Sequence, residues 1–74
     1  MYDFCLYEVS YYVSSFKGGS TLHRTATFCF FANAAYIAEK LSLANDVEGD
    51  VNIINAFTGE LEATYNRGEQ TYIN

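Results

Sequence analysis

The chain has 74 residues, of which 50% are hydrophobic and 18% aromatic, and its formal net charge is −5. A chain this short is expected to form a single domain over residues 1–74, and its hydrophobic content is too high for a disordered polypeptide. Lys and Arg together number only 4 and are scattered, which argues against direct nucleic-acid binding, because phosphate contacts require clustered basic side chains.

The N-terminal segment and the cysteines indicate the cellular compartment. Asp3 and Glu8 lie in a segment that alternates like a strand, so the sequence predicts no signal peptide. No apolar stretch reaches the length of a membrane span, so we expect no membrane association. The chain has 2 Cys and no glycosylation acceptor, whereas secreted domains of this size usually have about four or more Cys. We therefore expect a cytoplasmic protein.

The first predicted element is a β-hairpin. Residues 2–16 are rich in Tyr, Val and Phe, and residues 21–31 read as the returning strand. The Gly18-Gly19 pair between them supplies the positive φ angles of a two-residue turn. This turn predicts a register in which Val9 lies opposite Phe28, and it gives the hairpin one consistently apolar face.

The next predicted element is an amphipathic helix from Ala34 to Ala44. Asn33 is a suitable N-cap residue, and Ile37, Ala38 and Leu41 follow the spacing of one helix face. The polar residues that follow favour a loop between this helix and the next strand.

A second hairpin and a short final strand complete the predicted elements. Residues 50–57 form a β-branched run, and residues 57–59 resemble a three-residue loop in which Gly59 has a left-handed conformation. This loop predicts that Ala56 faces Glu60. The sequence Asn66-Arg67-Gly68 repeats this kind of three-residue loop and allows a short last strand over residues 69–73.

These elements predict an α+β fold, in which one helix packs on one face of a four- to five-stranded antiparallel sheet. The element order is β-β-α-β-β-(β), and a single helix can cover only one face of such a sheet. The expected helix-side core consists of the apolar strand residues Tyr7, Val9, Tyr11, Val13, Leu22, Ala26, Phe28, Phe30, Val51, Ile53, Leu61 and Ala63.

The opposite sheet face is the predicted partner-binding surface. Exposed apolar clusters mark interaction sites, and interface cores favour aromatic side chains. The alternative is that a register is misassigned and these side chains belong to the core. The predicted partner-binding residues combine apolar and acidic side chains: Leu6, Glu8, Tyr12, Phe31, Asp50, Ile54, Glu60, Glu62 and Tyr72.

The candidate catalytic and metal-binding residues do not form a known constellation. His23 is the only His and is expected opposite Ser14, but this pair lacks an orienting carboxylate. The acidic residues 46–50 do not match the spacing of a calcium loop. Glu60 and Glu62 share a strand face, which lacks the dry, concave site that acid–base catalysis requires. We predict that the protein is not an enzyme and needs no metal or cofactor.

The stretch Val51-x-Ile53-x-Asn55-Ala56-Phe57-Thr58-Gly59-Glu60-Leu61 and the order of elements resemble small acidic proteins of bacteriophages and mobile elements, such as anti-CRISPR proteins. This resemblance implies a cytoplasmic inhibitor without cofactors that masks a basic, nucleic-acid-binding surface of a target protein, for instance in a nucleoprotein complex. It assigns no functional residue.

Charge supports a basic partner. Residues 1–38 sum to zero, whereas residues 39–74 contain 2 basic and 7 acidic residues, which gives 2 − 7 = −5. An acidic surface favours association with a basic protein. The alternative hypothesis is a homodimeric structural or regulatory module in which two copies cover the exposed sheet face or pair their edge strands.

Overall fold

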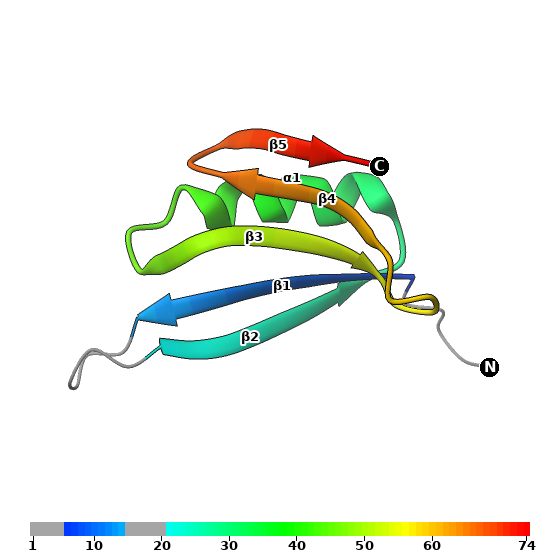
Figure 1. The fold of residues 1–74 in the computed structure, drawn as a ribbon, viewed down its shortest axis with the longest axis horizontal. Coiled ribbons are helices and arrows are strands. Elements are labelled where there is room, and N and C mark those ends of the chain that lie inside the picture. Colours follow the sequence, from blue (N-terminus) through cyan, green and yellow to red (C-terminus); the bar gives the residue numbers. More distant parts are fainter. Residues whose placement is uncertain (1–5, 15–20) are drawn as a thin grey trace.

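The computed structural model describes residues 6–14 and 21–74, which form a five-stranded antiparallel sheet and one helix (Figure 1). The strand order in the sheet is β2-β1-β3-β4-β5, so both terminal elements of this order are edge strands. This arrangement confirms the predicted α+β class and the optional last strand. The elements are β1 (Tyr7–Ser14), β2 (Thr21–Phe28), α1 (Phe31–Ser42), β3 (Val47–Asn55), β4 (Leu61–Asn66) and β5 (Glu69–Ile73).

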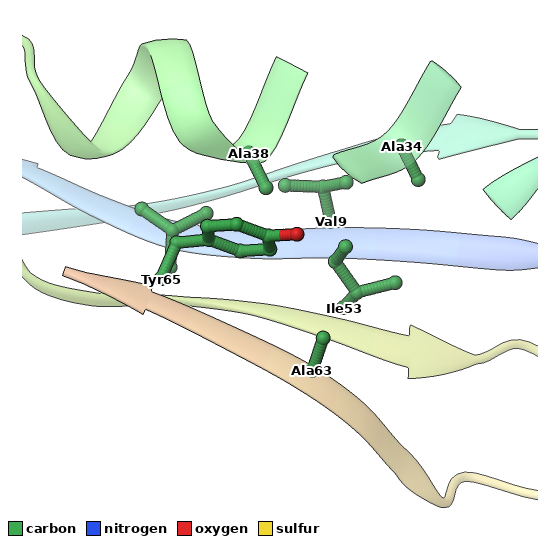
Figure 2. Packing of buried hydrophobic residues seen from close by; sticks show 7 residues of the cluster. Val9, Ala34, Ala38, Ile53, Ala63 and Tyr65 are labelled. Atoms are coloured by element: carbon green, nitrogen blue, oxygen red, sulfur yellow. The ribbon is translucent and has the colours of Figure 1, made fainter. Parts of the chain in front are cut away.

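The core lies between α1 and the middle of the sheet. The sheet contributes Val9, Val51, Ile53, Ala63 and Tyr65, and the helix contributes Ala34 and Ala38. Figure 2 shows Ala38 pointing toward Val9 and the ring of Tyr65. Because the buried helix residues are small, α1 can lie close to the strands. Most of the sheet residues of this core agree with the prediction.

α1 does not cover the helix-side face evenly. It contacts β3 most extensively and has far fewer contacts with β2, which lies at the edge of the sheet (Figure 1). Leu22 on β2 is consequently 51% exposed. The prediction of Leu22 as a core residue is therefore wrong, because the contacts between α1 and β2 do not bury this end of the strand.

The register between β1 and β2 differs from the predicted one. Val9 pairs with Ala26 instead of Phe28, and Tyr7 pairs with Phe28. The shift is an even number of residues, so each side chain keeps its predicted face. The predicted Gly18-Gly19 turn lies outside the described residues. Phe30 follows the strand and is 69% exposed, so its assignment to the core is also wrong.

α1 begins at Phe31, three residues before the predicted start at Ala34. Phe30 is the N-cap residue, has an extended backbone and makes no side-chain capping hydrogen bond. The Phe31 ring packs edge-on against the Tyr7 ring, with centroids 5.4 Å apart and an interplanar angle of 75°. This aromatic contact favours an early helix start despite the capping preference of Asn33.

α1 ends at Ser42, earlier than the predicted Ala44, with Leu43 as the C-cap residue. The backbone N–H of Leu43 donates to the carbonyl of Lys40, and that of Ala44 donates to the carbonyl of Leu41. These bonds tighten the last turn and close the helix.

The hairpin between β3 and β4 has a longer loop than predicted. The backbone N–H of Asn55, not Ala56, pairs with the carbonyl of Glu60 at 2.8 Å. The Asn55 Oδ1 atom accepts the N–H groups of Phe57 and Thr58 at 2.9 and 3.0 Å, which stabilises the turn. Gly59 has the predicted positive φ angle, 78°.

A register irregularity follows this hairpin. Ile53 pairs with Ala63 as predicted, but Ile54 pairs with Leu61 instead of Glu62. Such a bulge locally rotates the strand, and Leu61 is exposed. Leu61 is therefore not the core residue that the alternation predicts.

The turn between β4 and β5 consists of Arg67 and Gly68, whose φ angles are 52° and 82°. Asn66 and Glu69 pair on either side of it. Positive φ angles at both central residues are typical of the mirror-image hairpin turn. The strand Glu69–Ile73 therefore matches the prediction, whereas the turn has two central residues instead of the predicted three-residue loop, because Asn66 pairs with Glu69 as part of the ladder.

Candidate functional site

The sheet face opposite α1, here called the open face, is the candidate functional site. Strand pairing and side-chain alternation place hydroxyl, amide, carboxyl and aromatic side chains on it. Its residues are Thr21, His23, Thr25 and Thr27 on β2, Glu8, Ser10, Tyr12 and Ser14 on β1, Glu48, Asp50, Asn52 and Ile54 on β3, Leu61, Glu62, Thr64 and Asn66 on β4, and Glu69 and Tyr72 on β5.

The charged side chains of the open face are acidic. Its carboxylates belong to Glu8, Glu48, Asp50, Glu62 and Glu69. Outside residues 1–5 and 15–20, every Lys and Arg lies elsewhere on the molecule. An uncompensated row of this kind produces a negative potential over the face.

The described basic residues occupy three separate positions. Arg24 pairs with Tyr11, which places it on the helix-side face. Lys40 belongs to α1, and its ammonium nitrogen lies 5.2 Å from the centroid of the Tyr36 ring. Arg67 belongs to the turn between β4 and β5. None of them is a strand position of the open face, although Arg67 lies in the turn that joins the open-face residues Asn66 and Glu69.

Two carboxylates of the open face accept hydrogen bonds from neighbouring amides. Asp50 Oδ1 accepts the Asn66 Nδ2 group at 2.8 Å. The Glu62 carboxylate accepts longer bonds from Asn55 and Asn74, at 3.5 and 3.4 Å. These bonds hold the two acids across neighbouring strands.

A polar row crosses the middle of the open face. Ser10 Oγ and His23 Nε2 form a hydrogen bond of 2.6 Å. Thr64 Oγ1 donates to Asn52 Oδ1 at 2.8 Å. The strand pairs join this row directly, because Ser10 pairs with Asn52 and Asn52 pairs with Thr64.

His23 lies opposite Tyr12, not opposite the predicted Ser14, because of the β1–β2 register. The His23 and Tyr12 rings are 4.8 Å apart at an interplanar angle of 32°. The Ser10–His23 hydrogen bond is exposed to solvent, whereas nucleophilic catalysis needs a third orienting group and general-base catalysis works best in a site shielded from water.

The apolar side chains of the open face are fewer than predicted. Tyr12 is 48% and Tyr72 44% exposed, whereas Ile54 is half-buried. Leu6 directly precedes β1 and is exposed at this end of the sheet. The apolar side chains of the open face are therefore Tyr12 and Tyr72, together with the aliphatic residues Ile54 and Leu61 and the neighbouring Leu6.

Phe31 and Glu60 do not lie where the sequence places them. Phe31 belongs to α1 and packs against the core on the helix side, so its predicted place on the partner-binding face is wrong. Glu60 lies at the end of the β3–β4 hairpin, paired with Asn55, outside the row of Glu62. The other predicted residues, Leu6, Glu8, Tyr12, Asp50, Ile54, Glu62 and Tyr72, lie on or beside the open face.

Sequence reasoning missed Glu48 and Glu69. Glu48 lies two residues before Asp50 in the same strand, so alternation alone could have placed it on this face. It was missed because β3 begins at Val47 instead of Asp50. Glu69 pairs with Asn66 across the last turn, and that turn was recognisable from its Gly.

The described residues show neither a metal cluster nor a membrane-spanning element. Within residues 6–14 and 21–74, no three His, Cys, Asp or Glu side chains gather closely enough to hold a metal ion. In the same part of the chain, no helix is long and apolar enough to cross a membrane.

In comparisons with known proteins, no protein-family model, no curated protein and no solved structure matches the chain.

Proposed function

We propose that this domain is a binding module, not an enzyme, and that its open face binds a basic surface of a partner protein. The observation that carries the proposal is the set of carboxylates on this face without a Lys or Arg among its described residues. Complementary charge favours such an encounter and discourages acidic competitors.

The open face has acidic groups that can attract a basic partner and aromatic groups that can make contact with it. Glu48, Asp50 and Glu69 are exposed and can meet Lys or Arg of a partner. Tyr12 and Tyr72 offer aromatic area with polar tips, which is the chemistry that interface cores favour. The charges therefore accelerate the encounter, and the tyrosines contribute contact area after docking.

The partner class that best fits this chemistry is a protein whose basic residues ordinarily contact nucleic-acid phosphates. A row of carboxylates can occupy the same Lys and Arg side chains and thereby exclude the nucleic acid. This is the mode of action implied by the resemblance to anti-CRISPR proteins, and it places the protein in the cytoplasm beside a nucleoprotein target.

Charge reversal of two exposed open-face acids tests this proposal. The variant Glu48→Lys/Glu69→Lys introduces positive charge on β3 and β5 while leaving the hydrogen-bonded Asp50 and Glu62 intact. We expect affinity for the partner to fall by on the order of tenfold or more, because like charges in an interface cost several kcal/mol. The readout is quantitative affinity capture from host lysate, followed by binding measurements on each captured protein.

A matched control distinguishes an effect of charge on the open face from an effect of the total net charge. Glu39→Lys/Asp46→Lys makes the same change in net charge at exposed positions on α1 and in the loop after it. Wild type and control should capture the same nucleic-acid-binding proteins, and excess nucleic acid should release them. Equal capture by the open-face variant, or capture that nucleic acid does not affect, would contradict the proposal.

A further inference from the structure

The two edges of the sheet differ in how well they are protected against pairing with another strand. β5 has only 5 residues, contains an irregularity in its pairing with β4 and begins with Glu69. Short length, bulges and charges are the usual protection of an edge. β2 has 8 residues, a single Arg and no acidic residue, and an uninterrupted register with β1. β2 is therefore the edge open to a further strand.

The backbone hydrogen bonds of the β1 segment determine which groups of β2 face this edge. The Leu6 carbonyl accepts from Ala56 and the Ser14 N–H donates to Asp46, so these residues of the β1 segment point toward β3 and the loop before it. Backbone groups alternate in direction along a strand, so the N–H and carbonyl groups of the odd-numbered residues of β1 point toward β2. These residues are Tyr7, Val9, Tyr11 and Val13. Their partners are Phe28, Ala26, Arg24 and Leu22. The intervening residues Thr21, His23, Thr25 and Thr27 consequently direct their N–H and carbonyl groups outward.

We infer that β2 pairs with β2 of a second copy of this chain, antiparallel and centred on Thr25. In this register Thr25 lies opposite Thr25 of the partner copy, and the backbone groups at the centre can exchange both hydrogen bonds. Facing β-branched side chains are a favourable cross-strand pair. The ladder then extends over residues 22–28, nearly the full strand.

The side chains of the helix-side face distinguish this register from its neighbours. Centring on Thr25 places Arg24 opposite the small Ala26 and Leu22 opposite Phe28. Centring on Arg24 would instead place two guanidinium groups directly opposite each other, which is destabilising. Centring on His23 would shorten the ladder and place Leu22 opposite Arg24. The Thr25 register alone among these pairs apolar with apolar residues and separates the like charges.

The exposure of β2 supports the same occupant. Leu22 is 51% exposed and Phe28 is half-buried, because α1 lies mainly over β3. A two-fold axis perpendicular to the sheet brings Leu22 of each copy onto Phe28 of the other and buries apolar area at both ends of the ladder. The exposed apolar residues of β2 are thus self-complementary.

Charge does not oppose this pairing. The described carboxylates of the sheet lie on β1, β3, β4 and β5, so the edge itself presents no facing acids. The two sheets would merge into one, with both helices on one side and both open faces on the other. This dimer leaves the proposed binding face uncovered and does not depend on the proposed function.

A proline at the centre of the edge tests the inference. Thr25→Pro removes an outward N–H and preserves the bonds between β1 and β2, which is the setting in which an edge strand tolerates Pro. Sedimentation equilibrium should show that the wild type is a dimer and that Thr25→Pro is a monomer. The far-ultraviolet circular dichroism spectrum of Thr25→Pro should equal that of the wild type.

The matched control places the same residue at the other edge. The Asn74 N–H donates to the Glu62 carbonyl, so the neighbouring Ile73 N–H points away from β4. Ile73→Pro should leave the dimer intact. A wild-type chain that stays monomeric at all concentrations, or a dimer lost in Ile73→Pro and kept in Thr25→Pro, would overturn the inference.

Cysteine cross-linking decides the register without altering the backbone, and it remains informative if Thr25→Pro fails to fold. Directly opposed residues in a hydrogen-bonded pair have Cα atoms roughly 5.5 Å apart, which suits a disulfide. Thr25→Cys should therefore yield a covalent dimer on oxidation. Thr27→Cys, whose partner in this register is His23, should yield no more than the wild type with its native cysteines. Equal cross-linking of both variants would refute the Thr25-centred pair.

Discussion

Ser42 connects the end of the helix to the last turn of the sheet. It is buried, with 4% of its surface exposed. Its Oγ atom donates to the Glu39 carbonyl at 2.7 Å and accepts the Gly68 N–H at 2.8 Å. A single hydroxyl thus satisfies a helix carbonyl and the N–H of a turn residue that is 26 positions away from Ser42 in sequence.

We predict that Ser42→Ala lowers the free energy of unfolding by about 1–3 kcal/mol, because it leaves the Gly68 N–H without its partner in a partly buried site. Urea denaturation measures the change. Ser14→Ala is the matched control, since its hydroxyl makes an exposed bond of 3.2 Å to the Asp46 carbonyl, and it should change stability by less than about 0.5 kcal/mol. Equal effects of the two substitutions would show that the Ser42 bond contributes nothing specific.

At the scale of elements, two turn glycines share a backbone conformation but differ in their surroundings. Gly59 and Gly68 have φ angles of 78° and 82°. A Cβ atom on Gly59 would meet nothing within 4 Å, whereas a Cβ on Gly68 would lie 2.9 Å from Leu43 Cδ2. The two positions therefore separate backbone strain from steric contact.

We predict that Gly59→Ala costs about 1–2 kcal/mol, the usual penalty of a left-handed conformation, and that Gly68→Ala costs more. Leu43 is 54% exposed, so its side chain must turn outward to admit the new methyl group. Thermal or urea unfolding gives both values. Introducing Leu43→Ala in both backgrounds should make the two costs equal; a persistent difference would exclude Leu43 as its cause.

The packing of α1 depends on its small residues. Ala38 is fully buried between the helix and the sheet, as Figure 2 shows. We predict that Ala38→Leu destabilises the protein by roughly 1–3 kcal/mol through overpacking. Ala32→Leu, an exposed change on the same helix, should stay within about 0.5 kcal/mol. Chemical denaturation checks both, and a tolerated Ala38→Leu would mean that α1 can move away from β3.

The boundary of a strand or helix could be predicted from the sequence where the residues of the adjoining turn determine it by themselves. The bounds of β5 follow from Arg67-Gly68, whose positive φ angles need no distant contact. The start of α1 was not predictable from capping preference, because the contact between Phe31 and Tyr7 joins residues far apart in sequence. The bulge opposite Ile54 has no signature in the alternation of polar and apolar residues.

At the scale of the whole molecule, the helix-covered sheet and its open face were predictable, but the character of that face was predicted only in part. The acids Glu8, Asp50 and Glu62 lie there as expected. Phe31 belongs to the helix side instead. Moving one aromatic residue across the sheet changes the face from apolar and acidic to hydroxylated and acidic. Such a displacement depends on tertiary packing, which a local pattern does not encode.

The hydrogen bonds between neighbouring strands have a thermodynamic consequence for docking. Ser10 with His23, Asn52 with Thr64, and Asp50 with Asn66 restrict one another's rotamers before any ligand arrives. Ordering a flexible side chain on association costs roughly 0.5–1.5 kcal/mol. In the proposed complex, these three pairs would therefore add little to the entropic penalty of association, because their side chains are already ordered in the unbound domain.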